Sequence, residues 1–363
     1  MTLNNNIKIK TNASEVFIGN EVFDVLSETL KPYQGTKIFI LVDENTLEHC
    51  ITKLITHNEI LHNAEILEID SGEENKTLEV CYQLWKTLAD YKADRKSLLI
   101  NLGGGVITDM GGFIASTYKR GIDFMNIPTT LLAQIDASVG GKTGVDFEGL
   151  KNIIGVFNEP QGVFIYPEFL KTLDKRQMLS GYAEALKHAL IKDAAYWSVL
   201  KEGMLSDAEN WTALITRSVH IKNDIVLNDP LEKNERKLLN FGHTIGHAIE
   251  SFSLANDQHP LCHGEAIAIG MVCESYISNK ANRMSKADLA DISSTVNNFY
   301  TPYELHQSNY HSYIELMGND KKNENDAINF TLLSAIGKGD FNKEIGVELI
   351  LESLNYYNTI NKG

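Results

Sequence analysis

The sequence predicts an α/β domain with a parallel sheet, followed by a mainly helical domain. In the first half of the chain, short β-branched runs alternate with longer helical segments, which is the order of a parallel sheet covered by helices on both faces. After Pro167, long helical periods take over, with few strand candidates until Ala327 to Ile336. We therefore expect two domains, residues 1–174 and residues 175–363.

Three strands are expected in the first domain, with helices between them. Their apolar runs are short, β-branched and bounded by polar turn residues, as in strands that are buried on both faces. A helix should follow the first strand, with Asn45 as its N-cap, and another should form around Val80 to Leu88. The predicted strands are Lys37 to Asp43, Ala64 to Asp70 and Ser97 to Leu102.

Composition restricts the class of protein. A chain of 363 residues can build two cores, and its formal net charge of -15 argues against nonspecific nucleic-acid binding. A small anionic substrate stays compatible with this charge, because a few convergent cations suffice to bind it. The four cysteines form no CxxC pair, and no run approaches the ~20 apolar residues of a membrane span. We expect a cytoplasmic protein without membrane or nucleic-acid partners.

A glycine triplet, Gly103 to Gly105, follows the third predicted strand and leads into a helix. Glycines at such a turn let the backbone approach a phosphate and direct free N–H groups at it. The spacing departs from GxGxxG, because Thr108 occupies the third glycine position, so a tight turn without a ligand is the alternative. Asp43, which ends the first strand, is a candidate for a ribose hydroxyl, although an Asp there is more often a helix cap.

A second polar region surrounds the glycine pair at 140–141. It contains Asp136, Lys142, Lys151 and Asn152. Lysines beside flexible glycines suit a phosphate or a carboxylate, each acting as a point charge. The alternative is a solvated hairpin with ordinary surface lysines.

The helical domain has polar residues that share one helix face. Glu184, Lys187 and His188 stand at i, i+3 and i+4 of a predicted helix, although an exposed Glu–Lys pair would give the same pattern. A solvated polar turn is expected at Lys321 to Asn325.

A cluster of histidines is the strongest indication of a metal site. Catalytic zinc takes three protein ligands and leaves one position open. His243 and His247 stand four apart, so on a helix they project from one face and form a common metal grip. Spacing does not identify the third ligand, for which Cys262 and Glu184 are also candidates. The four histidines within 21 positions are His243, His247, His259 and His263.

Six segments together resemble the 3-dehydroquinate synthase family. They follow the family's order and near-family spacing between about Phe17 and Lys338. One departure is a loop between His243 and His263 that is a few residues longer than usual. The segments are GGGVITDMGG, IPTTLLAQIDASVGGKTGVDF, LKNIIGVF, GYAEALKH, NERKLLNFGHTIGHAIE and HGEAIAIGM.

The resemblance implies an N-terminal Rossmann-like NAD-binding α/β domain and a mainly α-helical C-terminal metal-binding domain. The family acts in the shikimate pathway of aromatic amino acid biosynthesis as an NAD- and divalent-metal-dependent carbon–oxygen lyase. It converts 3-deoxy-D-arabino-heptulosonate 7-phosphate to 3-dehydroquinate and phosphate. The route is transient NAD oxidation, phosphate β-elimination, re-reduction, ring opening and intramolecular aldol closure. Zinc, with cobalt as the alternative, and a homodimer are also implied.

The resemblance assigns roles to individual residues. It implies that Glu184, His243 and His263 bind the metal. His247, which spacing alone paired with His243 as a metal ligand, would instead face the substrate. The implied cofactor positions are Asp43, Ser71, Gly72, Glu73, Lys76, Gly104, Gly105, Val106, Asp109, Thr129, Thr130, Lys142, Lys151, Phe169 and Thr172. The implied substrate positions are Arg120, Asp136, Lys142, Asn152, Lys187, Lys222, Arg236, Asn240, His247 and Lys338.

Three other functions are compatible with parts of the sequence. Another sugar-phosphate cyclase, such as a 2-epi-5-epi-valiolone or 2-deoxy-scyllo-inosose synthase, would share the scaffold, but Asn152, Arg236, Asn240 and His247 together favour dehydroquinate. A metal-dependent alcohol or glycerol dehydrogenase would lack the SVGGKTG loop. A noncatalytic NAD-sensing or structural zinc protein would have no use for so many cations.

Overall fold

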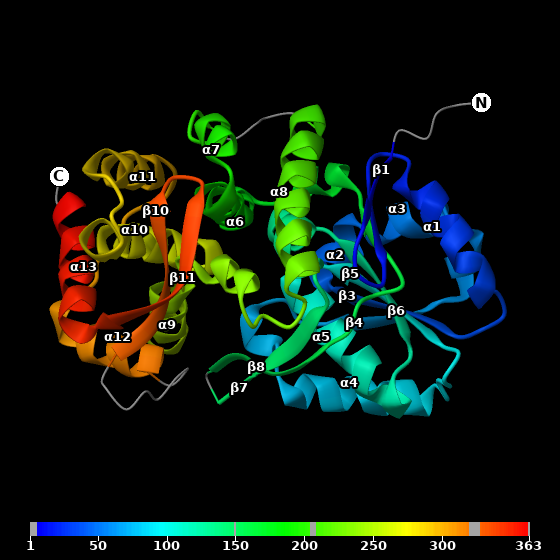
Figure 1. Cartoon of the computed structure of the whole chain (residues 1–363). Coiled ribbons are helices and arrows are strands. Elements are labelled where there is room, and N and C mark those ends of the chain that lie inside the picture. The colour runs from blue at the N-terminus through cyan, green and yellow to red at the C-terminus, as the bar shows by residue number, and fades with distance from the viewer. Residues whose placement is uncertain (1–5, 149, 204–207, 319–326, 362–363) are drawn as a thin grey trace. The chain divides into compact units, whose positions relative to one another are not determined.

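The computed structural model describes residues 6–148, 150–203, 208–318 and 327–361 (Figure 1). Its chain divides into two compact units, Met1–Asp174 with Leu205–Leu227, and Lys175–Met204 with Asn228–Gly363. The first unit thus includes a stretch that the sequence-based boundary places in the second domain. The polar turn expected at Lys321 to Asn325 lies outside the described residues.

The first unit is built on a seven-stranded sheet with the order β1-β2-β9-β6-β5-β3-β4. The pairing of β1 with β2 is antiparallel, and all other neighbours are parallel. A separate antiparallel hairpin joins β7 to β8. The strands are β1 Ile7–Lys10, β2 Glu15–Ile18, β3 Ile38–Asp43, β4 Glu65–Ile69, β5 Leu98–Gly103, β6 Asp123–Pro128, β7 Lys142–Phe147, β8 Leu150–Phe157 and β9 Val163–Ile165.

Two apolar cores lie on opposite faces of this sheet, because successive strand residues point to opposite sides. On β3, Ile38 and Ile40 pack with α1 and α3, whereas Phe39 and Leu41 pack with α4 and α5. Both faces of the sheet are therefore covered, which explains its continuous apolar runs. The helices of this unit are α1 Val22–Leu30, α2 Glu44–His49, α3 Ile51–Thr56, α4 Leu78–Asp90, α5 Gly105–Thr117 and α8 Ala208–Asn228.

The second unit is mainly helical and is centred on α10, which is buried along most of its length. Helices α6, α9, α11 and α13 pack around α10, as does strand β10 (Figure 1). A single hairpin, β10–β11, is the sheet in the described part of this unit. Its elements are α6 Lys175–Lys192, α7 Ala194–Leu200, α9 His243–Asn256, α10 His263–Ala281, α11 Lys286–Phe299, α12 Tyr310–Gly318, β10 Ala327–Ala335, β11 Lys338–Gly346 and α13 Val347–Ile360.

The predicted fold class and the three predicted strands are confirmed, with strand ends shifted by at most a residue. The predicted N-cap at Asn45 is wrong. The cap is Asp43, whose extended backbone lets its carboxylate accept the backbone N–H of Thr46 at 2.8 Å. That helix also breaks at Cys50 into α2 and α3. No helix in the described ranges has the length and apolar character that crossing a membrane requires.

Candidate functional site

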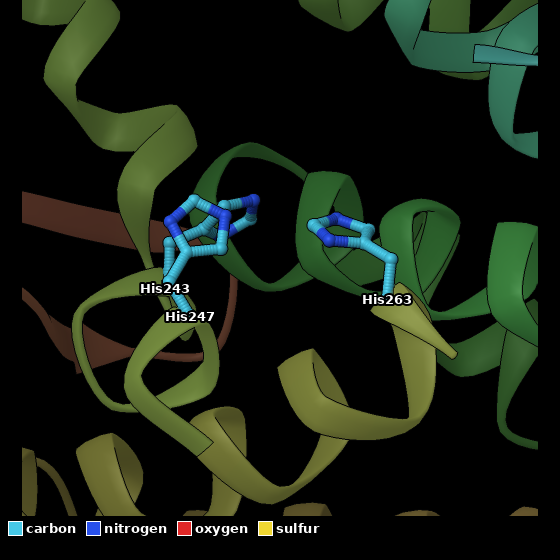
Figure 2. Close-up of side chains that lie close together, drawn as sticks. All are labelled: His243, His247 and His263. Atoms are coloured by element: carbon cyan, nitrogen blue, oxygen red, sulfur yellow. The ribbon is translucent and has the colours of Figure 1, made fainter. Parts of the chain in front are cut away.

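Three histidine side chains converge in the helical unit (Figure 2). His243 is the first residue of α9 and His247 stands one turn later, while His263 is the first residue of α10. A ligand nitrogen from each ring can be chosen so that all three atoms lie within 4.8 Å of one another. The predicted i, i+4 pair is therefore present, and the longer loop between α9 and α10 still brings His263 to it.

Glu184 on α6 joins two of these histidines. Its Oε1 atom lies 3.5 Å from Nε2 of His243 and 3.2 Å from Nε2 of His263. The Glu184 side chain is fully buried, and Lys187 forms an ion pair with it one turn along the same helix. The Glu184 carboxylate thus lies close to a ring nitrogen of each histidine in the implied metal triad.

The second nitrogen of each of these two rings faces an acceptor. Nδ1 of His243 lies 3.0 Å from the carbonyl oxygen of Phe241, and Nδ1 of His263 lies 3.2 Å from Oε2 of Glu250. A proton held at Nδ1 leaves the Nε2 lone pair directed at Glu184, and this is the tautomer that binds a metal through Nε2. The donor set of two imidazoles and one carboxylate therefore fits a zinc ion with an open fourth position.

The two ligand histidines have opposite pKa shifts. Burial lowers the pKa of His243, and nearby Lys187 lowers it further, against the opposing charge of Glu184. His243 is thus neutral, as a metal ligand must be. Burial would also lower the pKa of His263, but the charges and hydrogen bonds of Glu250 and Glu184 outweigh it and raise the pKa to about 10. Without a metal, that ring is therefore in its doubly protonated, charged form and lies between two carboxylates.

Close packing of α9 on α10 sets the position of His243. Gly242, the residue before it, has a left-handed backbone with φ of 81° and lacks a side-chain cap. The fully buried carboxylate of Glu274 on α10 takes that role, accepting the backbone N–H of Gly242 at 2.7 Å and that of Ile245 at 3.1 Å. A Cβ at Gly270 would lie 1.9 Å from the Gly242 carbonyl oxygen, so only glycine allows this approach.

Of the other predicted substrate residues of the helical unit, two lie on the segment before α9 and one begins β11. Arg236 is buried, and its guanidinium donates to the carbonyl of Pro230 at 2.7 Å. Asn240 donates to Glu232 at 2.9 Å. Lys338, at the start of β11, is exposed.

The glycine triplet connects β5 to α5 in the first unit. Gly104 is the N-cap of α5 and has no side chain to cap it, so the first N–H groups of the helix stay available to a phosphate. A Cβ at Gly104 would lie 3.0 Å from Thr130, one of the two predicted threonines after β6. Strand, glycine turn and helix thus form the geometry predicted for a phosphate site.

A network of buried charges lies beside this turn. The Lys76 ammonium donates to Asp109 on α5 at 2.7 Å and to Asn152 on β8 at 2.6 Å. Burial would lower the pKa of Lys76, but Asp109, Glu73 and Asp146 outweigh it and raise the pKa. Lys151 lies 3.0 Å from Glu73. The structure therefore joins predicted cofactor residues to Asn152, which was predicted to bind substrate.

Cations of the first unit fall into two environments. Lys222 on α8 forms an ion pair with Asp136 at 2.5 Å and also donates to its backbone carbonyl at 2.6 Å. Arg120 and Lys142 are exposed. Asp136 lies in a π-helical turn, Ala133–Ala137.

The remaining predicted cofactor residues mostly make contacts with nearby residues of the first unit. Asp43 caps α2, and Ser71 donates to Glu44 at 2.5 Å. Phe169 packs in the core against Phe23 and Tyr166, and the Thr172 hydroxyl donates to the Phe169 carbonyl. Gly72 has φ of 110°, which favours glycine.

Sequence reasoning missed three carboxylates of these sites. Asp146 accepts the backbone N–H of Asn152 at 2.7 Å and lies 3.6 Å from Lys151. Glu274 caps α9, and nothing in local spacing indicates this contact across helices. Glu250 stands seven residues after His243, the spacing of one helix face, and that signal was present in the sequence.

The predicted residues divide cleanly between the units. All cofactor positions belong to the first unit and all metal positions to the second. Of the substrate positions, the first unit contains Arg120, Asp136, Lys142, Asn152 and Lys222, and the second contains Lys187, Arg236, Asn240, His247 and Lys338.

Comparison with known sequences identifies the family. The profile of the 3-dehydroquinate synthase N-terminal domain matches residues 66–180, and that of the C-terminal domain matches residues 181–323. The 3-dehydroquinate synthase of Parabacteroides distasonis is 44% identical, over 94% of this chain and 97% of that protein. The enzyme of Campylobacter jejuni subsp. jejuni is 38% identical, over 97% of this chain and 99% of that protein.

Solved structures share the whole fold. A 2-epi-5-epi-valiolone synthase from Streptomyces hygroscopicus, solved with NAD⁺ and Zn²⁺, has a TM-score of 0.84 and 25% identity, over 97% of this chain and 98% of that one. A 2-deoxy-scyllo-inosose synthase, solved with carbaglucose-6-phosphate, NAD⁺ and Co²⁺, has a TM-score of 0.86 at 24% identity, over 97% of this chain and 99% of that one. The matches to both profiles and to relatives over nearly the full length show that the chain belongs to the 3-dehydroquinate synthase family.

Proposed function

We propose that this protein converts 3-deoxy-D-arabino-heptulosonate 7-phosphate to 3-dehydroquinate and phosphate, with NAD and a divalent metal. The observation that carries the proposal is the meeting of Glu184 Oε1 with the Nε2 atoms of His243 and His263, in a chain of this family. A phosphate-eliminating cyclase of this kind is a carbon–oxygen lyase.

Glu184, His243 and His263 would hold the metal. A bound Zn²⁺ or Co²⁺ supplies Lewis acidity, which lowers the pKa of a substrate hydroxyl and stabilises the ketone formed from it. Lys187 forms an ion pair with Glu184 and helps to orient that carboxylate. His247 lies beside the triad, with its ring centroid 4.9 Å from that of His243, and is the side chain for hydrogen bonding or proton relay to the substrate.

Residues of the first unit would hold NAD. When bound, NAD⁺ supplies the hydride acceptor and returns the hydride later in the same turnover. The N–H groups at the start of α5, from Gly105 and Val106 onward, suit its pyrophosphate. Lys76 and Asp109 orient the β8 segment through Asn152, so this network links cofactor binding to a substrate residue.

Anionic groups of the substrate would be bound by cations. Arg120 and Lys142 are exposed and suit the phosphate, where they would position it and offset the charge that develops as it leaves. Lys222, which pairs with Asp136, and Arg236, which donates to Pro230, would contact the carboxylate and hydroxyl groups of the substrate. An acidic protein can thus bind an anionic substrate through a few local cations.

One assay tests the function and separates it from the alternatives. The purified protein is incubated with the heptulosonate phosphate, catalytic NAD⁺ and zinc, and phosphate and 3-dehydroquinate are measured together. We expect equal amounts of both products, with many turnovers per NAD⁺. A dehydrogenase would accumulate NADH in proportion to product, another cyclase would leave this substrate unchanged, and a noncatalytic protein would release no phosphate. Any of these results would overturn the proposal.

We also propose that the protein is a cytoplasmic homodimer, on the basis of its family resemblance. Light scattering behind a sizing column tests the assembly, with twice the chain mass of 40.6 kDa as the expected result. A species of single-chain mass at micromolar concentration would contradict it.

A further inference from the structure

Glu250 lies directly behind one of the proposed metal ligands. His243, His247 and Glu250 stand at i, i+4 and i+7 of α9, so they form one stripe on the helix. The Glu250 side chain is 7% exposed, and its Oε2 atom lies 3.2 Å from Nδ1 of His263. The same helix therefore presents one proposed ligand and contacts the ring of another.

This contact determines which nitrogen of His263 is available. A carboxylate beside Nδ1 accepts a hydrogen bond from the Nδ1–H and so favours the tautomer in which Nε2 carries a lone pair and no proton. Nε2 already lies 3.2 Å from Glu184 Oε1, where the metal would bind. The reverse tautomer would place a proton in the metal position and a lone pair against the Glu250 carboxylate, which is repulsive.

The two proposed ligand histidines differ in the strength of the hydrogen bond that Nδ1 donates. His243 has the neutral carbonyl of Phe241 at Nδ1, whereas His263 has a charged carboxylate. Hydrogen bonds to an ionised acceptor are about twice as strong as neutral ones, and they make the imidazole a more basic ligand. Because a buried carboxylate requires a polar partner, Glu250 and His263 also hold each other in place.

We propose that Glu250 is a positioning residue of the metal site, which accepts a hydrogen bond from the Nδ1–H of His263 and fixes the ring so that Nε2 binds the ion. This inference rests on the proposed function only in requiring that Glu184, His243 and His263 bind a metal. A structural role alone, linking α9 to the start of α10, would change the stability of the metal-free protein and leave intrinsic zinc affinity alone.

The test measures zinc affinity directly, without turnover. Metal-free protein competes with a chromophoric chelator for zinc, and the unfolding of the same preparation in urea is recorded. We expect Glu250→Leu to bind zinc about 10–100-fold more weakly than the native protein. Glu250→Gln, which keeps the size and one acceptor oxygen, should show a smaller loss, and it serves as the test if the leucine variant does not fold.

The matched control is Asp291→Asn. Asp291 is a partly buried carboxylate of the same unit that accepts from Trp197 at 2.8 Å and Lys201 at 3.0 Å. Its variant should keep native zinc affinity even if its stability falls. Native affinity in both Glu250 variants, or an equal loss in Asp291→Asn, would overturn the proposal.

A spectroscopic measurement identifies the nitrogen involved. In the zinc-loaded native protein with ¹⁵N-labelled histidine, we expect His263 to keep a proton on Nδ1 and to coordinate through Nε2. Coordination through Nδ1 would overturn the proposal. Failure to form 3-dehydroquinate would instead count against the proposed reaction, because neither the zinc titration nor the spectrum depends on turnover.

Discussion

Replacing Gly270 by alanine tests the packing that places His243. A Cβ at Gly270 would lie 1.9 Å from the Gly242 carbonyl oxygen and 2.9 Å from both the Gly242 carbonyl carbon and the Gly246 nitrogen. All three are backbone atoms, so no side-chain rotation can relieve the overlap. Ordinary contact begins at 3.4 Å, and the start of α9 must therefore move by about 1.5 Å relative to α10.

That displacement is large on the scale of a metal site. Metal–ligand distances tolerate roughly 0.2 Å, so His243 and His263 could no longer coordinate one ion in their present positions. Overpacking of this kind costs roughly 1–3 kcal/mol of stability. A misplacement of about 1 Å can cost roughly 100-fold in rate, so the loss of activity should be larger than the loss of stability suggests.

Three measurements on Gly270→Ala check this reasoning: urea unfolding of the metal-free protein, zinc affinity by chelator competition, and phosphate release. The control is Gly318→Ala in α12, where a new Cβ meets no atom of the described residues within 4 Å. It should keep zinc affinity and gain up to about 1 kcal/mol of stability, because alanine favours helix. Native stability and zinc affinity in Gly270→Ala would refute the argument.

Three further predictions concern single side chains. His263→Ala should lose zinc and all turnover, since it removes a donor from the proposed triad; full activity of a chelator-washed native preparation would contradict the metal assignment. Lys76→Met should lower the unfolding free energy in urea by about 2–3 kcal/mol, because Asp109 loses its cation. This is somewhat less than the loss for a fully buried pair, since the Asp109 side chain is 18% exposed. An unchanged urea midpoint would show that water replaces the ammonium. Burial raises the pKa of Glu274 from 4.5 to about 8, although hydrogen bonds from backbone N–H groups act to lower it. Between these pH values the folded protein therefore holds a proton that the unfolded chain has released. The stability that this proton contributes is fully present below about pH 4.5 and is lost as the pH rises to 8, by up to roughly 5 kcal/mol at 1.36 kcal/mol per pH unit. Glu274→Gln should lack this dependence. Equal pH slopes of the unfolding free energy in the two proteins would contradict the prediction.

The sequence predicted β3 and β5, because their burial on both faces leaves a continuous apolar run, and it also predicted the edge strand β4. It did not predict β6 or β9, which lie on the other side of β5. It also did not predict β1 and β2, which are strands of only four residues and carry little periodic signal. The membership of α8 in the first unit was also not predictable, because helical periodicity shows that one face is buried and does not show against which core. Asn45 was misplaced as a cap because Asp43, two residues earlier, offers the better acceptor geometry.

For the metal site, helical spacing placed His243 and His247 on one face, as the structure has them. Spacing could not select Glu184, which lies on another helix and is brought in by tertiary packing; the family resemblance supplied it. The same limit applies to Glu274, whose contact with the start of α9 crosses between helices. Only Glu250 had a local signal, its seven-residue spacing from His243.

The division of the chain into units also affects synthesis on the ribosome. The first unit needs α8, because Lys222 pairs with Asp136 and Asn223 donates to the carbonyl of Lys10 at 3.0 Å. These residues emerge only after the start of the second unit, Lys175–Met204, has been translated. At about 5–20 residues per second, the residues from Asp174 to Leu227 take roughly 3–10 s to make. During that delay the first unit lacks α8 and these two contacts, so a fragment that ends at Asp174 is expected to be less stable than the complete unit.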